Sequence, residues 1–293
     1  MDLMNRNLRI LNITSWSMNG AVASIILKAY YKNCKTIFTT YRTLSEKMIS
    51  DEKSEYDCVI FTNIAPIKNR EFYLRMKKPL VIFDHHENAN WWKEQKNNAW
   101  HVNGDYSGAM MVYLYYKRWM TDLERFKEIA FFADDFELWK LTDNKSFFFN
   151  TLFWLSNNPS SFLERWKNGI FKITDEEKNL LTSHVDRWKK FYEELPQLEL
   201  KKNGRFLTAN EFHSEISKQM DIEGVAYFLV YHPKSNYITI RSHNALINCQ
   251  KILSGMKVFT ASSNVGIIPC RDGEEAKEIC KRIENIIDSS LHY

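Results

Sequence analysis

The stretch VIFDHHENAN, residues 81–90, ends an apolar run on one acid and two adjacent histidines, Asp84, His85 and His86, and then becomes polar. The run consists of branched and aromatic residues, which is typical of a strand that is buried on both faces. Three interpretations of the tripeptide are open. The histidines can cap a following helix, they can be satisfied loop residues, or they can take part in metal chemistry. Imidazole and carboxylate suit divalent ions of the manganese or zinc type, and in the third interpretation one side chain binds metal while its neighbour binds a substrate oxygen.

The segments before this stretch alternate between strand-like and helical patterns. We predict strands over 8–14, 35–41, 56–63 and 79–86, and a helix over 20–33. Short β-rich runs that alternate with helical segments indicate an α/β fold with a parallel sheet. Ligands of such sheets bind beyond the carboxyl ends of the strands. Because Ser15 to Asn19, Asn63 and Asp84 to His86 follow three predicted strands, we expect them to share one crevice.

The remainder of the chain predicts a helical region and a second domain. Helical patterns dominate residues 105–195, and the last helix begins with a capping box of Thr174 and Glu177 and stops at Pro196. Strands and helices alternate again after Pro196. We therefore expect an N-terminal parallel-sheet domain over 1–173, a linker helix over 174–196 and a smaller α/β domain over 197–293.

The composition is that of an ordinary globular chain, with 293 residues, 44% hydrophobic and 26% charged, and a formal net charge of +4. This mild charge permits an anionic ligand without arguing for one. The five cysteines form no CxxC pair, which indicates reduced thiols and a cytoplasmic protein. No apolar run approaches the ~20 residues of a membrane span, so no membrane association is expected.

The motifs, taken in order, resemble those of the DHH phosphoesterases. This family includes RecJ-like nucleases, oligoribonucleases, cyclic-dinucleotide phosphodiesterases and related pyrophosphatases. The similar stretches are ILNITSWSMNGAVASIILKAYY (10–31), YDCVIFTNIAP (56–66), VIFDHH (81–86), DYSGAMMVYLYY (105–116) and FADDFELWKL (132–141). Residues 206–220 and 225–242 resemble the opening of the family's C-terminal, DHHA1-type substrate domain. The resemblance implies both domains and a phosphoesterase site with two metal ions.

Most of the metal-ligand positions implied by the resemblance are neutral in this chain. The family's first motif reads H-x-D-x-D-G, and Gly20 matches its glycine, so that Ser15, Ser17 and Asn19 occupy the ligand positions. Asn63 stands where the second motif has a metal-bridging aspartate. Ser15 and Ser17 are therefore degenerate ligand positions, and we expect one of the two metal ions to be absent.

The other metal position retains more of its ligands. It would use Asn19, Asn63, His85 and an acid of the fourth motif, for which Asp135 is the first candidate and Asp134 the competing alignment. With a single anionic ligand, the affinity for Mn²⁺ or Mg²⁺ should be low. We therefore expect one weakly bound ion or none.

The resemblance also assigns catalytic and substrate-binding positions. Asp84 and His86 are the candidates for acid–base work. His86, the helix start at Ser107 and Gly108, and the IRS element with Arg241 and Ser242 are the candidates for substrate binding. Arg241 can bind a phosphate in bidentate fashion or form a surface ion pair. The family's GGGH stretch is replaced here by SGMKVFTASSNVG (254–266).

Three tryptophans near the DHH tripeptide have two possible roles. Trp91, Trp92 and Trp100 can stack on nucleobases. The more common role of such tryptophans is packing between helices or domains, which we favour here.

Three functions are consistent with these observations. The favoured one is a pseudoenzyme that binds a nucleotide or a short single-stranded nucleic acid between its domains, with two-metal hydrolysis weakened or lost. The second is an active phosphodiesterase or nuclease that uses a single Mn²⁺ or Mg²⁺ ion. The third is a non-catalytic scaffold for a protein partner. The sequence leaves the oligomeric state open.

Overall fold

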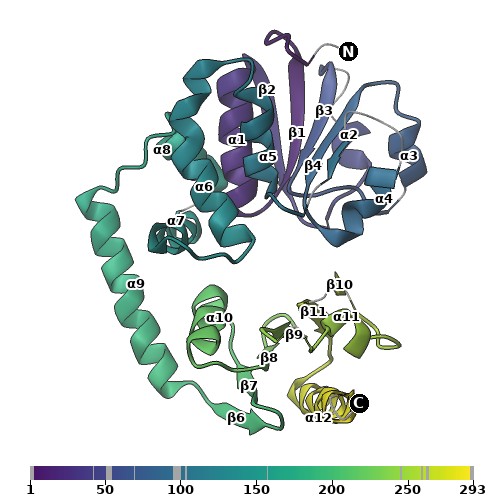
Figure 1. Cartoon of the computed structure of the whole chain (residues 1–293), viewed down its shortest axis with the longest axis vertical. Helices are drawn as coiled ribbons and strands as arrows, with labels where there is room; N and C mark the ends of the chain where they lie inside the picture. The colour runs from purple at the N-terminus through teal and green to yellow at the C-terminus, as the bar shows by residue number, and fades with distance from the viewer. Residues whose placement is uncertain are drawn as a thin grey trace. The chain divides into compact units, whose positions relative to one another are not determined.

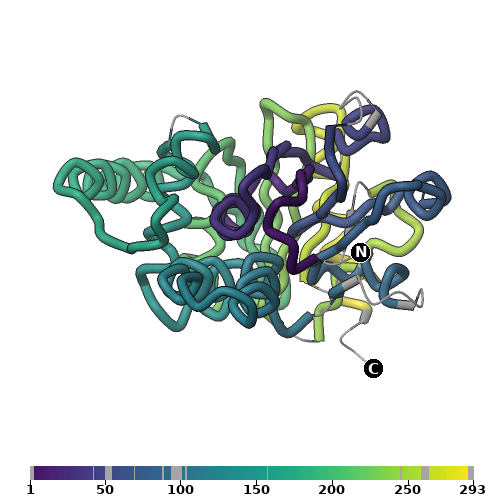
Figure 2. The backbone as a smooth tube through the Cα atoms, turned by 90° about the horizontal axis from the view of Figure 1, so that it is seen from above, coloured from purple at the N-terminus to yellow at the C-terminus, as the bar shows by residue number. Residues whose placement is uncertain are grey.

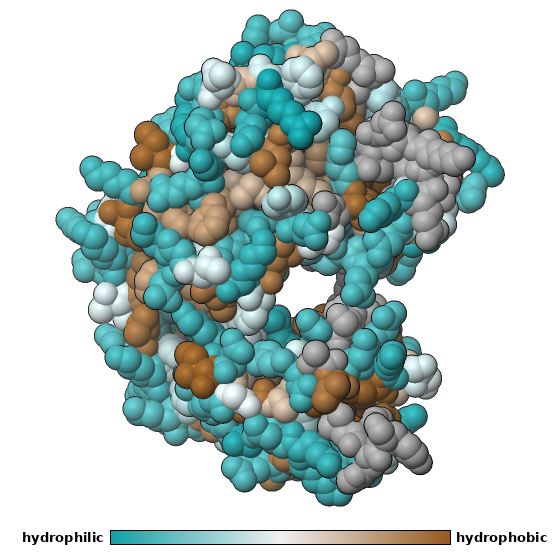
Figure 3. Space-filling view, in the orientation of Figure 1, coloured by the Kyte–Doolittle hydropathy of each residue, from teal (hydrophilic) through white to brown (hydrophobic). Residues whose placement is uncertain are grey.

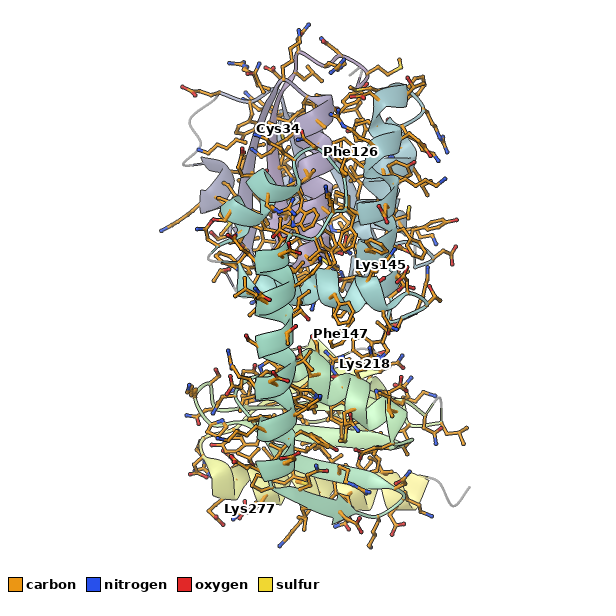
Figure 4. The ribbon with its side chains drawn as sticks, turned by 90° about the vertical axis from the view of Figure 1, so that its left-hand side faces the viewer. Cys34, Phe126, Lys145, Phe147, Lys218 and Lys277 are labelled. Carbon is orange, nitrogen blue, oxygen red and sulfur yellow. The ribbon has the colours of Figure 1, made fainter. Side chains whose placement is uncertain are left out.

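In the computed structural model of the protein, the described residues are 3–41, 43–50, 55–68, 70–94, 100–102, 104–156, 158–244, 246–258, 260–261 and 264–290. The chain divides into two compact units, Met1–Leu181 and Thr182–Tyr293. The division falls inside α9 (Asp175–Glu194), the helix that the sequence predicted as a linker (Figure 4). Each unit has its own sheet and its own hydrophobic core.

Unit 1 is built on a five-stranded sheet in the order β2-β1-β3-β4-β5 (Figure 1). Every neighbouring pair of strands is parallel, which confirms the predicted parallel sheet. The strands are β1 (Arg9–Ser15), β2 (Asn33–Thr39), β3 (Cys58–Thr62), β4 (Leu80–Asp84) and β5 (Trp100–Val102). The central strands β3 and β4 are buried at every residue, as expected for strands that are covered on both faces.

Helices cover both faces of this sheet (Figure 1). One face packs against α1 (Met18–Tyr30) and α5 (Gly108–Tyr116). The helices α6 (Lys127–Glu137), α7 (Asn144–Leu155) and α8 (Pro159–Trp166) pack against these two or against each other and complete the same core. The other face packs against α2 (Lys47–Ser50), α3 (Arg70–Leu74) and α4 (Asn90–Glu94). Two 3₁₀ turns, Glu87–Ala89 and Thr121–Phe126, lead into α4 and α6. Because side chains alternate along a strand, Ile10 and Leu11 enter opposite cores.

Helix α1 is the central helix of unit 1, seen end-on in Figure 2. It contacts β1, α5 and α6, and most of its residues are buried. A helix that is apolar nearly all round is one enclosed by other elements. The Ser17 hydroxyl caps its first turn by accepting from the Gly20 N–H at 3.1 Å.

Unit 2 contains a mixed six-stranded sheet in the order β10-β11-β9-β8-β7-β6. Its strands are β6 (Gln197–Leu200), β7 (Gly204–Thr208), β8 (Tyr227–His232), β9 (Tyr237–Ser242), β10 (Thr260–Ala261) and β11 (Val265–Pro269). Its helices are α10 (His213–Ile222), α11 (Cys249–Ile252) and α12 (Gly273–Ser290). Helices α11 and α12 cover one face, and α10 with the end of α9 covers the other. This is the smaller α/β domain that the sequence predicted.

The visible surface is mainly hydrophilic, as expected for a chain with an ordinary share of charged residues. Hydrophilic residues dominate the face seen in Figure 3, with apolar residues scattered among them. None of the helices in the described ranges is both long and apolar enough to cross a membrane. All five cysteines are free thiols.

Candidate functional site

The carboxyl ends of three adjacent strands bring the predicted site residues together. Strands β1, β3 and β4 end at Ser15, Thr62 and Asp84, and Asn63 directly follows β3. A parallel sheet delivers such residues to one edge. Asn63 has a φ of +54°, a left-handed conformation that asparagine tolerates better than most residues.

Two glycines let helices begin directly against these strand ends. A Cβ atom at Gly20 would lie 2.2 Å from the Ser15 carbonyl oxygen. A Cβ atom at Gly108 would lie 2.6 Å from the Asn63 backbone nitrogen. Neither position accepts a larger residue without a shift of the backbone. The first turns of α1 and α5 are thereby held against the site.

Asp84 organises the two histidines that follow it. Its fully buried carboxylate accepts from the His86 Nδ1–H at 2.6 Å, from the His85 backbone N–H at 2.9 Å and from the Tyr41 hydroxyl at 3.2 Å. Burial alone would raise the pKa of Asp84 and lower that of His86. The attraction between the two side chains outweighs burial, so the pKa of Asp84 is below its usual value and that of His86 is raised to about 9. At neutral pH they form a carboxylate–imidazolium pair.

This pairing fixes what His86 can offer a ligand. Because Nδ1 donates to Asp84, Nε2–H is the remaining donor on the ring. The His86 side chain is 34% exposed, so a ligand can reach it. A protonated imidazole cannot bind a metal ion, but it can donate a charge-assisted hydrogen bond to a phosphate oxygen.

His85 is neutral, in contrast to the protonated His86. Burial, followed by the positive charge of His86, lowers the pKa of His85, which keeps its ring neutral. Its Nε2 atom lies 3.7 Å from Oε1 of Glu137. Two ligands that bind one divalent ion at ~2.1 Å can be up to ~4.2 Å apart, so this pair fits around a single ion.

A hydrogen-bonded network of neutral side chains occupies the other expected ligand positions. The Asn63 amide nitrogen donates to the Ser15 hydroxyl at 2.9 Å, the Ser17 hydroxyl at 3.3 Å and Oε1 of Glu137 at 3.1 Å. The two serine hydroxyls are 2.7 Å apart. The amide oxygen of Asn63 accepts from the Asn19 amide at 3.0 Å.

Asn19 extends this network to the first turn of α5. It is fully buried, and its amide oxygen accepts from the Ala109 backbone N–H at 2.7 Å. The amide groups of Asn19 and Asn63 therefore have partners within the protein. We call Ser15, Ser17, Asn19 and Asn63 the neutral network.

These residues do not fit a pair of divalent metal ions. Two ions need several anionic ligands, and the neutral network supplies none. The ligating atoms of Asp84, His85 and His86 lie within 4.8 Å of one another. Within that group, however, Asp84 and His86 are paired with each other, which leaves His85 as the neutral nitrogen ligand. The donor set that remains, His85 with Glu137, suits one ion.

Both aspartates of the fourth motif hydrogen bond to nearby groups, and the charge of Asp134 also acts on His85. The Asp135 carboxylate accepts from the Thr142 backbone N–H at 2.9 Å and from the Asp143 backbone N–H at 3.3 Å, and so fixes the turn after α6. The Asp134 carboxylate accepts from the Ser107 N–H at 2.6 Å and from the Lys140 ammonium at 2.7 Å. That Asp135, or alternatively Asp134, supplies the acid to a metal ion stays a prediction.

Glu137 is an acid beside the His85 ring, and the sequence did not single it out. It is the last residue of α6, and about 200° of helical rotation separates it from Asp135. The two side chains consequently point to different sides of the helix. The signal that identifies Glu137 is the FELW tail, in which it takes the acidic position of a DLW-like sequence.

The two positions at the start of α5 serve the structure of the site. Ser107 is fully buried as the N-cap of α5, and its hydroxyl accepts from the Met110 N–H at 3.4 Å. Gly108 permits the contact with Asn63 described above. Their predicted contact with a substrate stays a prediction.

In unit 2, Arg241 lies on β9, and its charge acts on His213, which belongs to a pair of histidines that the sequence did not single out. The His213 and His232 rings are 4.7 Å apart, and Nε2 of His232 lies 3.0 Å from the Thr239 hydroxyl. Burial, and then the charge of Arg241, lowers the pKa of His213. Burial, and then His213, lowers the pKa of His232 to about 4. Ser242, by contrast, hydrogen bonds to the Asn244 backbone in the turn after β9.

The tryptophans after β4 are packing residues as far as the structure describes them. Trp92 is fully buried, and its indole N–H donates to the Pro66 carbonyl at 2.7 Å. The Trp91 ring packs edge-on against Trp92, with the ring centroids 5.1 Å apart. The side chain of Trp100 lies outside the described residues.

Comparison with known proteins identifies the fold. No protein-family model and no curated protein matches the sequence. Among solved structures, the pGpG-specific phosphodiesterase PggH of Vibrio cholerae matches with a TM-score of 0.61 and 14% identity, over 96% of this chain and 100% of that one. The DHH domain of a member of a ribosomal protein family matches with 0.61 and 13%, over 96% and 86%. The exonuclease RecJ bound to manganese matches with 0.56 and 10%, over 99% and 92%. The chain therefore has the DHH-family phosphoesterase fold, as its motifs predicted.

Proposed function

We propose that this protein binds a nucleotide or a short single-stranded nucleic acid at the strand ends of unit 1, and that it has lost two-metal hydrolysis. The observation that carries the proposal is the neutral network, in which polar side chains pair with one another where the resemblance implies one histidine and three aspartates as metal ligands. Asparagine keeps nearly the shape of aspartate without its charge. The strand ends thus keep polar side chains, while the anionic ligands for two ions that would acidify a water molecule are missing.

The groups around the network suit a phosphate. His86 supplies an imidazolium donor that Asp84 orients, so Asp84 acts as a positioning residue. Helices α1 and α5 both begin at the site, with Ser17 and Ser107 as their N-caps. The helix dipole favours an anion at each N-terminus, while the N–H groups of Gly20, Ala109 and Met110 already have partners within the protein. In unit 2, we extend the proposal to Arg241 as a second phosphate-binding residue.

A second candidate function is a phosphodiesterase that uses one divalent ion, and the 3.7 Å separation of His85 and Glu137 favours it. Such an ion, when bound, would supply Lewis-acid stabilisation of a phosphate oxygen. The chain's own contribution would be His86, which can hold a proton at Nε2 beside the leaving oxygen. The similar structure of RecJ holds manganese, which is consistent with this candidate.

Calorimetric titration with AMP and with the dinucleotide pApA tests the proposal, first in chelator and then with Mn²⁺. We expect saturable binding in chelator that His86→Gln weakens about tenfold or more, since the variant loses a charge-assisted hydrogen bond. His101→Gln is the matched control, because this half-buried histidine stacks on Phe83 within the sheet. Absence of binding in both conditions would refute the proposal.

The same samples separate the two candidate functions. If the protein only binds, the dinucleotide stays intact with Mn²⁺ present. If one ion supports hydrolysis, mononucleotide accumulates with Mn²⁺, and Glu137→Gln abolishes that product while leaving binding in chelator unchanged.

A further inference from the structure

An exposed tryptophan lies inside the site loop, between two members of the neutral network. Trp16 separates Ser15 from Ser17, so its Cα atom is about 3.8 Å from the Cα atoms of both serines. Its neighbours turn their hydroxyls towards Asn63, yet the Trp16 side chain remains 48% exposed. A large apolar ring is therefore exposed to solvent between two serines of the polar site.

The backbone and a neighbouring ring hold Trp16 in place. Its backbone N–H donates to the Thr39 carbonyl at 2.9 Å, which ties the site loop to the end of β2. The indole ring packs edge-on against Phe38, with centroids 6.1 Å apart and planes at 66°. A ring fixed in this way loses little conformational freedom when a ligand covers its exposed part.

A second aromatic ring, that of Tyr41, lies beside the histidine pair. Tyr41 follows the end of β2 by two residues, and its hydroxyl donates to Asp84 at 3.2 Å. The Tyr41 ring packs edge-on against His86, with centroids 5.7 Å apart. Trp16 and Tyr41 thus both lie near the carboxyl end of the edge strand β2, since Trp16 bonds to Thr39 and Tyr41 follows Thr39 by two residues. Aromatic rings therefore lie beside the polar groups of the site.

We propose that Trp16 is the stacking platform for a nucleobase whose phosphate binds at His86 and the neutral network. This inference rests on the proposed function, and it names the feature of the ligand that the site recognises. A nucleotide combines a base that has an apolar face with a charged phosphate. The site offers the exposed Trp16 ring for the base and the His86 imidazolium for the phosphate. Aromatic stacking tolerates any base, so the site selects nucleotides over simple sugar phosphates without reading sequence.

Trp16 is exposed, whereas Trp92, which the sequence analysis considered for base stacking, is buried. Trp92 is fully buried and its indole N–H is satisfied by Pro66, so it cannot present a face to a ligand. Trp119 is as exposed as Trp16, at 52%, but it follows the far end of α5. Since α5 has nine residues, Trp119 lies more than about 13 Å from the start of α5 at the site.

The test compares AMP with ribose 5-phosphate by calorimetry, with Mn²⁺ and in chelator. One stacked base is worth a preference of about 5- to 150-fold, so the parent should bind AMP more tightly by a factor in this range. Trp16→Ala should reduce the AMP affinity to that of ribose 5-phosphate and leave the ribose 5-phosphate affinity unchanged. Trp16→Phe, which keeps an aromatic face, should retain most of the preference, and Trp119→Ala should retain all of it.

The outcomes distinguish this inference from the proposed function. If both compounds bind the parent equally, or if Trp16→Ala weakens both by the same factor, the stacking role is refuted while phosphate binding stands. If neither compound binds the parent in either condition, the proposed function and the stacking role are both refuted. An unchanged melting temperature of Trp16→Ala verifies that any loss reflects the missing ring.

Discussion

Replacing Asn63 by aspartate is the sharpest single perturbation of the neutral network. The substitution keeps the side-chain shape and the tolerance for the left-handed backbone at φ +54°. It replaces an amide that donates to Glu137 at 3.1 Å with a carboxylate at the same place. We therefore expect Asn63→Asp to create a repulsive pair of acids where the parent has a hydrogen bond.

The magnitude follows from the separation of the two groups. Two unit charges that relax to about 4 Å repel by about 4 kcal/mol at an effective dielectric constant of about 20. The Glu137 side chain is 19% exposed, so solvent screens part of this repulsion, and we expect a net loss of about 3 kcal/mol at pH 8. For a domain of this size, the melting temperature should fall by about 6–12 °C.

The assay measures the melting temperature of Asn63→Asp in chelator and with Mn²⁺, at pH 8 and pH 5. Repulsion raises the pKa of the acid pair in the native state, so protonation should restore part of the stability at pH 5. Mn²⁺ now has His85, Glu137 and a second carboxylate as ligands. Binding at 100 times the dissociation constant would restore about 2.7 kcal/mol at pH 8.

Asn12→Asp is the matched control. Asn12 is also fully buried, but its amide pairs with the hydroxyls of Ser24 and Thr62. This variant should lose stability without any recovery in Mn²⁺. Full stability of Asn63→Asp at pH 8 in chelator, or equal Mn²⁺ responses of the two variants, would refute the contact between Asn63 and Glu137.

Three further predictions address the scaffold, pH dependence and metal binding. Gly20→Ala should destabilise unit 1 by about 1–3 kcal/mol, since the new Cβ would overlap the Ser15 carbonyl, whereas Gly104→Ala, with no atom within 4 Å, should leave the melting temperature unchanged. The pKa of His232 is lowered to about 4, so between pH ~6.5 and ~4 the unfolded chain binds more protons than the native one. Unit 2 should therefore lose up to about 3 kcal/mol as the pH falls through this window, seen as smaller amide-exchange protection factors in β8, and constant protection factors would contradict the prediction. The third variant restores the ligand types of the family and combines Ser15→His, Ser17→Asp, Asn19→Asp and Asn63→Asp. Its melting temperature should be lower than that of the parent in chelator and should rise more with Mn²⁺. An equal rise in the two proteins would show that the four positions do not converge.

The buried strands were predictable from the sequence because burial on both faces leaves a continuous apolar signal, and β1, β3 and β4 lie within a few residues of their predicted bounds. Helix α9 is mostly exposed, and its bounds were predictable from the capping box at its start and from Pro196 after its end. Strand β5 has three residues and β10 has two, too few to show a period. Strand β6 is largely exposed, so its residues carry little apolar pattern. Such strands depend on pairing with a neighbour, which a local pattern does not record.

The site residues at the strand ends were predictable from the sequence. The acid on α6 was not, because the sequence does not show which side of the helix faces the site. The convergence of Ser15, Asn63 and Asp84 follows from the parallel sheet alone. Glu137 was missed because the sequence places three acids in the last turn of α6 without fixing which one faces His85. His213 was missed because its approach to His232 depends on tertiary folding between residues that are 19 positions apart.

Counting the manganese ions bound by the parent protein tests the central claim most directly. The account predicts at most one equivalent per chain after equilibration with Mn²⁺ and removal of the excess, and none in Glu137→Gln, measured by elemental analysis. Two tightly held equivalents in the parent would contradict it, because the neutral network supplies no anionic ligand for a second ion.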